Sequence, residues 1–331
     1  MTIPTLSFLP LFLLLLFSTT FTLSSSMDCN KIDRAVLLSI KQQLGNPSEL
    51  AAWLPATNCC TWFNVYCTDT GRVNGVYLSS LNVSSPLPPA LGNLPELTGI
   101  QIEIMPGLFG PIPTSFSKLS HLEYLQISGT SVSGSIPAFL THTNLGVLVL
   151  TNNKLSGPIP KALSGLSNLR YLDLSGNSLS GSIPPGLLHQ KSRFLMLSNN
   201  KLTGEIPRDY SNGDIDTIDL SHNRLTGNPS FLFGIAKPMT KIDLSWNELE
   251  FDMTHVMFPF HLTYLDLSHN RIKGRVAKSL KDLKLSNFNV SYNELCGEIP
   301  TGRYMAGHGA DCYLHNKCLC GTPLPPCSGG N

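Results

Sequence analysis

The chain has 331 residues, of which only 14% are charged, and 23 Lys and Arg against 22 Asp and Glu give a net charge of +1. This near-neutral balance excludes the usual nucleic-acid binders and polybasic membrane binders. Gly (27) and Pro (24) are too few and too aperiodic for collagen or a disordered tract, while 42% apolar residues supply an ample core. The 54 leucines favour a folded repeat architecture.

The first 26 residues have the features of a secretory signal peptide. A nearly unbroken apolar run from Leu6 to Phe17 is followed by small and polar residues up to Ser26. The run is too short to cross a bilayer core of roughly 30 Å, and small residues at this point suit signal peptidase. No second long apolar stretch and no hydrophobic tail for a lipid anchor follow. We therefore expect a secreted mature chain that starts near Met27 and does not span a membrane.

Ten copies of a unit of 23 to 25 residues fill residues 71–295. Each copy contains a pair of apolar residues close to Leu-x-Leu, usually with Asn three residues later, and six copies carry an intact Gly-x-Ile-Pro. This is the signature of leucine-rich repeats, and the alternation predicts a short strand with one buried face. The predicted fold is an α/β solenoid: a right-handed leucine-rich-repeat superhelix of ten plant-type repeats with a concave parallel β-sheet.

Two recurring features after each strand have structural explanations. Gly permits the bend at Gly-x-Ile-Pro, and Pro holds φ in an extended conformation. The motif is degenerate at Gly227, Glu250 and Gly274, where we expect an irregular convex side. The recurring Asn is expected to bond backbone groups of neighbouring coils, without any ligand. These residues are Asn153, Asn177, Asn200, Asn223, Asn247, Asn270 and Asn293.

An N-terminal cap is expected over residues 27–70, because the first open coil must be covered. Its four cysteines indicate disulfides in a secreted chain. Adjacent cysteines do not easily adopt disulfide geometry, and among the remaining pairings we favour Cys29–Cys59 and Cys60–Cys67. A helix is expected from Asp33 to about residue 44, ended by Gly-Asn-Pro. Its inward residues are expected to be Leu37, Leu38, Ile40 and Leu44.

A second cap is expected over residues 296–331, where the other five cysteines lie. An odd number leaves one over, and we expect Cys312 to be unpaired or to form an intermolecular bond. Export into an oxidising compartment favours disulfides over a zinc cluster. The ligands of that less favoured cluster would be Cys312, His315, Cys318, Cys320 and Cys327.

The two cysteine-rich ends resemble those of the plant polygalacturonase-inhibiting proteins. The matching stretches are Cys59-Cys60-Thr-Trp62-Phe-Asn-Val65-Tyr-Cys67 and the ending from Leu295-Cys296-Gly-Glu-Ile-Pro300 to Cys327, and the likeness covers the whole mature chain. The resemblance implies an extracellular, cell-wall protein that blocks pectin-degrading endopolygalacturonases of fungi or insects. It also implies the pairings Cys29–Cys59, Cys60–Cys67, Cys296–Cys318 and Cys320–Cys327.

The resemblance further implies that the enzyme is held on the concave strand face of repeats two to nine. An unperturbed Asp titrates near pH 3.9, so carboxylates on this face are expected to be ionised and to attract basic residues of the enzyme. Apolar and aromatic side chains would add contact area. Leu-Asp-Leu-Ser is also a common filling of such repeats, which is the structural alternative. The candidate partner-binding residues are Gln101, Glu103, Gln126, Val149, Asp173, Met196, Asp219, His222, Asp243, Trp246 and Asp266.

No catalytic or phosphate-binding motif is present, so we expect a binding protein that is not an enzyme and needs no cofactor or metal. Sequons at Asn82 and Asn289 are the expected glycosylation sites, and a glycan on Asn289 would place the partner nearer the middle of the sheet. A monomer is expected, with pectin in the cell wall as a further candidate partner. The rival functions are ice binding, as in a plant antifreeze relative, and a non-inhibitory scaffold for a wall component or receptor.

Overall fold

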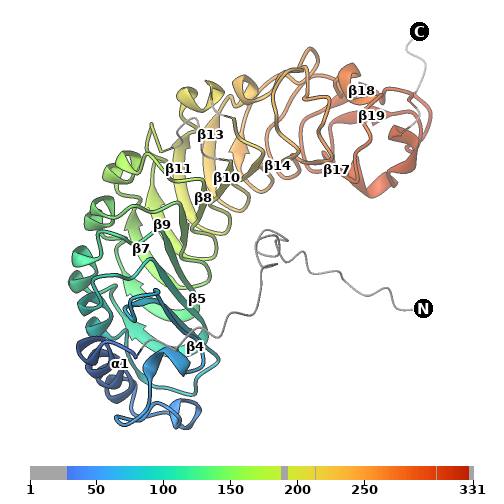
Figure 1. Ribbon diagram of the computed structural model, residues 1–331. Helices are drawn as coiled ribbons and strands as arrows, with labels where there is room; N and C mark the ends of the chain where they lie inside the picture. Colours follow the sequence, from blue (N-terminus) through green and yellow to red (C-terminus); the bar gives the residue numbers. More distant parts are fainter. Residues whose placement is uncertain (1–27, 188–192, 213, 303, 328–331) are drawn as a thin grey trace, which may run out of the picture.

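A computed structural model describes residues 28–187, 193–212, 214–302 and 304–327. These residues form a curved solenoid with α1 at one end and β18 and β19 at the other (Figure 1). The expected signal peptide lies outside the described residues. No helix in the described ranges is long and apolar enough to cross a membrane.

Ten parallel strands line the concave side, one for each predicted repeat, and each pairs with the strand of the next repeat. Their leucines and isoleucines point into a continuous core, which confirms the predicted solenoid. The strands are β2 (Val73–Ser79), β4 (Gly99–Gly110), β5 (Tyr124–Gly134), β6 (Val147–Val149), β8 (Tyr171–Asp173), β10 (Phe194–Met196), β12 (Thr217–Asp219), β14 (Lys241–Asp243), β16 (Tyr264–Asp266) and β17 (Asn287–Asn289).

A second set of parallel pairings, which the sequence analysis did not predict, runs along the coils after the Asn turn. The far ends of β4 and β5 begin it, so the two sets share these long strands. In each coil a buried leucine such as Leu155 or Leu202 anchors the segment while its neighbours stay outside. The shorter strands are β3 (Ser85–Pro86), β7 (Lys154–Pro158), β9 (Ser178–Gly181), β11 (Lys201–Glu205), β13 (Arg224–Gly227) and β15 (Glu248–Leu249).

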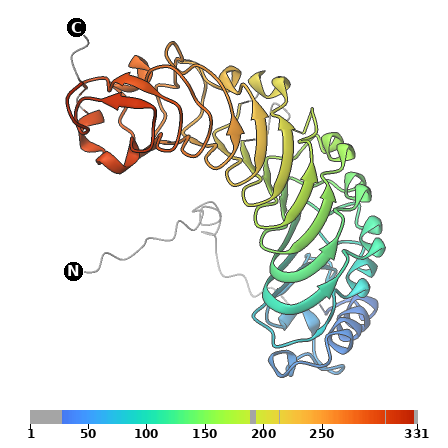
Figure 2. The ribbon, with the colours of Figure 1, turned by 180° about the vertical axis from the view of Figure 1, so that it is seen from behind.

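Short 3-10 helices cover the convex side of most coils and are seen on the outer rim of the arc (Figure 2). Pro at the motif end starts most of them, because its φ suits the residue before a helical turn. No helix lies between Leu249 and Tyr264, so the expected irregularity after Glu250 is confirmed there. It is wrong after Gly227 and Gly274, because short helices form at Ser230–Leu232 and Lys278–Leu280. The helices are η3 (Pro89–Asn93), η4 (Thr114–Lys118), η5 (Ala138–His142), η6 (Lys161–Gly165), η7 (Arg208–Asn212), η8 (Ser230–Leu232) and η9 (Lys278–Leu280).

The Asn turns form the predicted structural ladder. In the coil of Asn270, the side-chain Nδ2 donates to the carbonyls of Leu244, Leu267 and Ser268, at 2.9, 3.2 and 3.1 Å. Its Oδ1 accepts from the Leu249 amide at 3.0 Å. Asn316 repeats these bonds after the last strand and so extends the ladder into the C-terminal cap.

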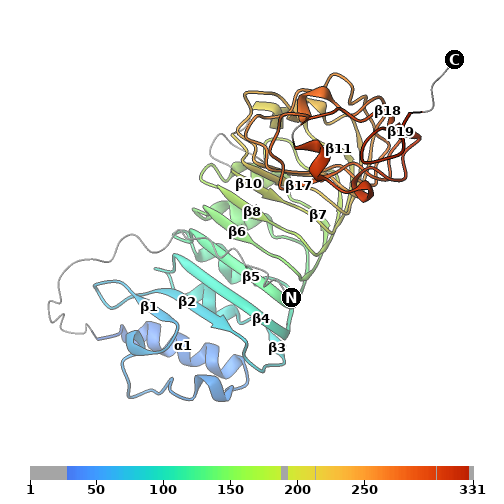
Figure 3. The ribbon, with the colours of Figure 1, turned by 90° about the vertical axis from the view of Figure 1, so that its right-hand side faces the viewer.

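The N-terminal cap is built on α1 (Lys31–Gln43), which begins two residues before the expected start and is capped by Asn30. Leu37, Ile40 and Leu44 are buried as expected, whereas Leu38 is only half-buried at the edge of the core. Antiparallel β1 (Val65–Cys67) covers the outer edge of β2, and α1 lies beside it (Figure 3). Short helices η1 (Ser48–Leu50) and η2 (Cys59–Thr61) complete this end.

A buried ion pair joins α1 to the first coil, which sequence reasoning missed. The Asp33 side chain is 1% exposed and accepts from Arg72 Nε at 2.8 Å and Nη2 at 3.0 Å. The amide of Val73 donates to the same carboxylate at 2.9 Å. Asp33 therefore fixes the helix against the start of β2.

All four expected disulfides are present: Cys29–Cys59, Cys60–Cys67, Cys296–Cys318 and Cys320–Cys327. The zinc-cluster alternative is wrong, since three of its five ligands are disulfide-bonded. Cys312 is a half-buried free thiol whose pKa is raised, mainly by burial. The C-terminal cap pairs β18 (Cys296–Glu298) with β19 (Cys318–Cys320) and includes η10 (Met305–Gly307) and η11 (Ala310–Cys312).

Candidate partner-binding face

The predicted central residues form one uninterrupted row across the concave sheet. Strand register places Gln101 opposite Gln126, and the row continues one residue per strand to Asp266 and Asn289. Glu103 lies two residues beyond Gln101, on the same side of β4, and is hydrogen-bonded to Gln126. We call this set the central row; its members are Gln101, Gln126, Val149, Asp173, Met196, Asp219, Asp243, Asp266 and Asn289.

The carboxylates of the central row are bonded within their own coils. Asp243 Oδ1 accepts from the amide of Ser245 at 3.2 Å and from its hydroxyl at 2.7 Å. Asp219 and Asp266 hold their following serines in the same way. These three serines are buried, so they close the strand ends and are not a free contact surface. This geometry supports the structural explanation of the Leu-Asp-Leu-Ser repeats.

Burial also changes the ionisation expected for two of these carboxyls. Asp243 is 8% exposed, and burial raises its pKa, with the neighbouring carboxylate of Asp219 adding to the rise. Burial likewise raises the pKa of Asp173. The expectation of an unperturbed aspartate is therefore wrong at these two positions. Asp219 is within 3.5 Å of Lys241 Nζ, which partly offsets its charge.

A second outward row, at the first residue of each strand, was not among the predicted site residues. Tyr171 and Phe194 lie side by side in it, with ring centroids 5.4 Å apart. Lys241 Nζ lies 4.7 Å from the ring centroid of Tyr264. Burial raises the pKa of Tyr171 to about 12, so its hydroxyl stays protonated. This row could have been predicted from the sequence, because residues two apart in a strand share a face and these residues lie two positions before the central row.

At the carboxyl ends of the strands, five rings stack into a ladder that only the structure reveals. The centroids of His222 and Trp246 are 5.2 Å apart, and those of Trp246 and His269 are 3.6 Å apart. Tyr292 follows at 4.0 Å from His269 and 4.0 Å from His315. The planes of successive rings differ by 12° to 21°. We call these five residues the ring ladder.

The ring ladder occupies backbone positions that disfavour such residues. All five have φ between 53° and 61°, a left-handed conformation that costs an L-residue roughly 1–2 kcal/mol. The same position in the other repeats carries Ser80, Ile104, Gly129, Asn152, Gly176 and Asn199, of which the glycines and asparagines tolerate that conformation better. Stacking offsets part of this cost. Trp246 and Tyr292 nevertheless remain 49% and 45% exposed, so they present apolar area beside the central row.

The packing of the ring ladder affects the protonation of His269. Burial lowers the pKa of His269, and the neighbouring His222 and His315 lower it further, against the attraction of Asp266. A neutral imidazole is therefore favoured at the middle of the ladder. The predicted site residues His222 and Trp246 are brought together here, while Gln101 and Glu103 lie at the opposite end of the sheet.

The two sequons have different surroundings. Asn82 is exposed after the first concave strand. Asn289 is half-buried, and its Oδ1 accepts from the amide and hydroxyl of Ser291 at 3.0 and 2.8 Å. Asn82 thus offers the freer acceptor, and glycan occupancy at both positions stays a prediction.

The fold and its concave face define a leucine-rich-repeat binding protein. The leucine rich repeat family matches residues 137–179, 192–212 and 259–281, and its N-terminal domain matches residues 30–68. Polygalacturonase inhibitor 1 of Arabidopsis thaliana is 44% identical over 321 residues, covering 95% of this chain and 97% of that protein. The polygalacturonase inhibitor of Vitis vinifera is 43% identical over 319 residues, covering 95% and 96%. The chain belongs to the polygalacturonase-inhibitor family of leucine-rich-repeat proteins.

One solved structure is also similar over most of the chain. The crystal structure of a plant ice-binding protein superposes with a TM-score of 0.89 at 41% identity, covering 92% of this chain and 100% of that one. The family members are named as inhibitors, so this is a family of binding proteins and not of enzymes.

Proposed function

We propose that the protein is a secreted cell-wall inhibitor that binds pectin-degrading endopolygalacturonases of fungi or insects on its concave face. Family membership supports the activity, and the ring ladder is the observation that carries the assignment to this face. The ring ladder keeps exposed rings at positions with positive φ, where Asn or Gly would have a lower conformational free energy. Such a cost is explained if the rings contribute to recognition, because aromatic residues are enriched among binding hot spots.

The proposed contact combines two kinds of surface. Trp246 and Tyr292 supply apolar area at the edge of the sheet, while Val149 and Met196 supply it within the central row. Asp219 and Asp266 give the face a negative character that attracts a basic enzyme surface. Inhibition would follow from covering the cleft of the enzyme, without any reaction catalysed by this chain.

The test measures reducing-sugar release from polygalacturonate by a panel of fungal and insect endopolygalacturonases, with and without the secreted protein. We expect at least one enzyme to be inhibited. Trp246→Asn and Tyr292→Asn should each weaken that inhibition about tenfold or more, the effect of losing a hot-spot ring. Both variants should fold, because Asn already occupies the same backbone conformation at Asn152 and Asn199.

The matched control is Phe260→Asn, which removes a ring that is 58% exposed and lies outside the concave strands. It should leave inhibition unchanged. Failure of the wild-type protein to inhibit any enzyme in a broad panel would contradict the proposed activity. Inhibition that both ladder variants retain in full would contradict the proposed face while leaving the activity in place.

A second candidate function is ice binding, which the likeness to a plant ice-binding protein favours. The central row speaks against it, because Val149, Asp173 and Met196 follow one another without a regular chemical repeat. Inhibition is therefore our first choice. If the purified protein showed thermal hysteresis and inhibited no enzyme of the panel, ice binding would become the favoured function.

A further inference from the structure

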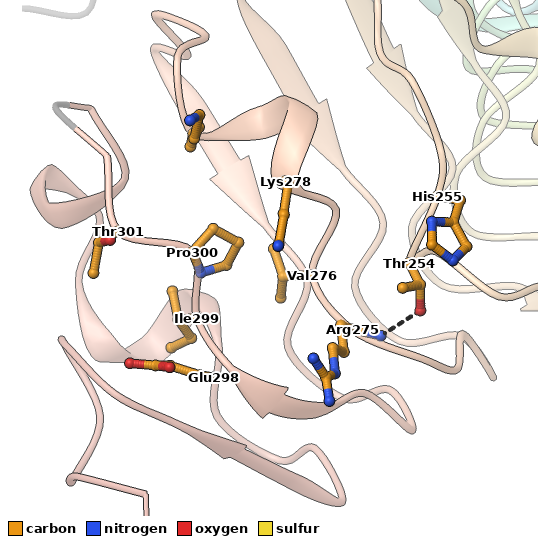
Figure 4. Close-up of a pocket in the computed structure, with 10 residues that line it drawn as sticks. Thr254, His255, Arg275, Val276, Lys278, Glu298, Ile299, Pro300 and Thr301 are labelled. Carbon is orange, nitrogen blue, oxygen red and sulfur yellow. Dashed lines mark hydrogen bonds between the residues drawn. The ribbon is translucent and has the colours of Figure 1, made fainter.

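A hollow of about 670 Å³ lies on the outer side of the last three repeats, away from the central row. Its walls are residues 254–255, 275–276, 278, 281 and 298–301, which follow three successive concave strands (Figure 4). In this view Lys278 extends from η9 toward the middle of the drawn residues, and Arg275 lies nearer Thr254. We call this feature the basic hollow. Its volume is in the range of ligand pockets.

The basic hollow exists because one coil lacks the usual convex helix. Between Leu249 and Tyr264 the described chain has no helix, and beyond β15 the second set of pairings continues only as a single bridge between Asp252 and Lys273. The neighbouring coil keeps η9. The floor is apolar and closed, since Val276 and Ile299 are each 2% exposed.

The lining of the basic hollow is positively charged in a chain that is nearly neutral. Three cations, Arg275, Lys278 and Lys281, face one carboxylate, Glu298, so the lining has a net charge of 3 − 1 = +2 with His255 neutral. Cations that converge on a concave, partly enclosed surface raise the local concentration of anions.

Two of these cations have no acidic partner within the part of the chain that the structure describes. No carboxylate oxygen lies within 4.0 Å of the side-chain nitrogens of Arg275 or Lys278. This is unlike Arg271 and Lys273 of the same repeat, which pair with acidic residues of the preceding coil. Arg275 lies against Gly297 through Cγ, Cδ and Nε, which helps to orient its side chain.

We propose that the basic hollow binds a small polyanion, a molecule with two or more carboxylate, sulfate or phosphate groups. More than one anionic group is required because Arg275 and Lys278 are separate charges, and a bidentate Arg contact leaves the lysine unpaired. The hydroxyls of Thr254 and Thr301 offer additional hydrogen bonds. This site is independent of the concave face and of the proposed inhibition.

The test is isothermal titration calorimetry of the secreted full chain with three probes: citrate, trigalacturonate and inositol hexakisphosphate. Acetate is the monoanion control. We expect at least one probe to bind, more weakly as salt rises because exposed charges are screened. The probe that binds identifies whether carboxylates, acidic sugars or phosphates are preferred.

The variant R275Q/K278Q should bind that probe about tenfold or more weakly, since hydrogen bonds to charged groups are lost. The matched control R271Q/K273Q removes the same net charge from the same repeat but lies outside the lining, and it should change affinity less than about twofold. All four side chains are exposed, so both variants should fold. Absence of binding by all three probes, or equal losses in the two double variants, would overturn the proposal.

Discussion

At the scale of single residues, the same turn after a concave strand is closed by a charged side chain in one repeat and by a neutral one in another. Asp243 and Asn289 occupy equivalent places in the central row, and each accepts from the amide and hydroxyl of the serine two residues later. Asp243 also accepts from the Tyr264 hydroxyl at 3.1 Å. A carboxylate is therefore not needed to close this turn. The negative charge at position 243 instead destabilises the folded state, because burial raises the pKa of the Asp243 carboxyl.

This argument predicts that Asp243→Asn stabilises the protein at neutral pH. A raised pKa in the folded state means that the folded chain binds the proton more tightly than the unfolded chain does. The ionised form therefore opposes folding above the folded pKa, and the penalty disappears as pH falls to the ordinary Asp value near 3.9. We expect a melting temperature about 2 °C higher at pH 7.

The check is calorimetry of both proteins from pH 7 to pH 3.5, with Asp266→Asn as the control in the next strand. The gain should shrink as the pH falls. A gain that stays constant over this range would show that charge is not its cause.

At the scale of elements, the Asn turns join each coil to the next. Asn270 is 9% exposed and satisfies three carbonyls and one amide from two coils. Recurrence at the same place in successive repeats is what made this role predictable from the sequence.

Asn270→Ala should lower the free energy of unfolding by about 2–3 kcal/mol, because buried backbone groups lose their partner. Asn168→Ala is the matched control, since Asn168 is exposed and its side chain, among the described residues, bonds only that of Asn144. Its effect should stay within about 0.5 kcal/mol. Urea unfolding measures both, and equal effects would contradict a special role of the turn.

At the scale of the whole molecule, the two caps close a stack in which each coil contacts mainly its neighbours. All four disulfides lie in these caps, outside the central coils. The free energy of unfolding of such a stack is approximately the sum of the stability of each coil and of the interfaces between neighbouring coils. When a cap is lost, the next coil therefore loses one of its interfaces. The caps should therefore control where unfolding begins.

Reduction of the disulfides should loosen the ends before the middle. We expect amide hydrogen exchange at Leu37 and Tyr313 to accelerate about tenfold or more, since each disulfide contributes roughly 2–4 kcal/mol. Exchange at Leu172 and Leu195 should change much less. Mass spectrometry of exchange in the oxidised and reduced protein measures this, and a uniform acceleration along the chain would contradict it.

The repeats, the strand on each coil and the Asn ladder could all be predicted from the sequence, and the resemblance of both ends implied the four disulfides. The repeats, the strands and the ladder follow from local periodicity, because a strand shows its buried face in every second residue. The disulfide pairings rest instead on the resemblance of the cysteine-rich ends. Periodicity indicated the leucine-rich-repeat class, whereas the resemblance of the two cysteine-rich ends indicated the family.

The interactions between residues one coil apart could not be predicted from the sequence and became visible only in the folded protein. The ring ladder, the raised pKa of Asp243, the ion pair of Asp33 and the basic hollow all depend on contacts between residues distant in sequence. Stacking of the coils sets these distances and removes water from some side chains but not others. Burial and proximity, and not residue type, therefore decide which of the repeated side chains remain available for binding.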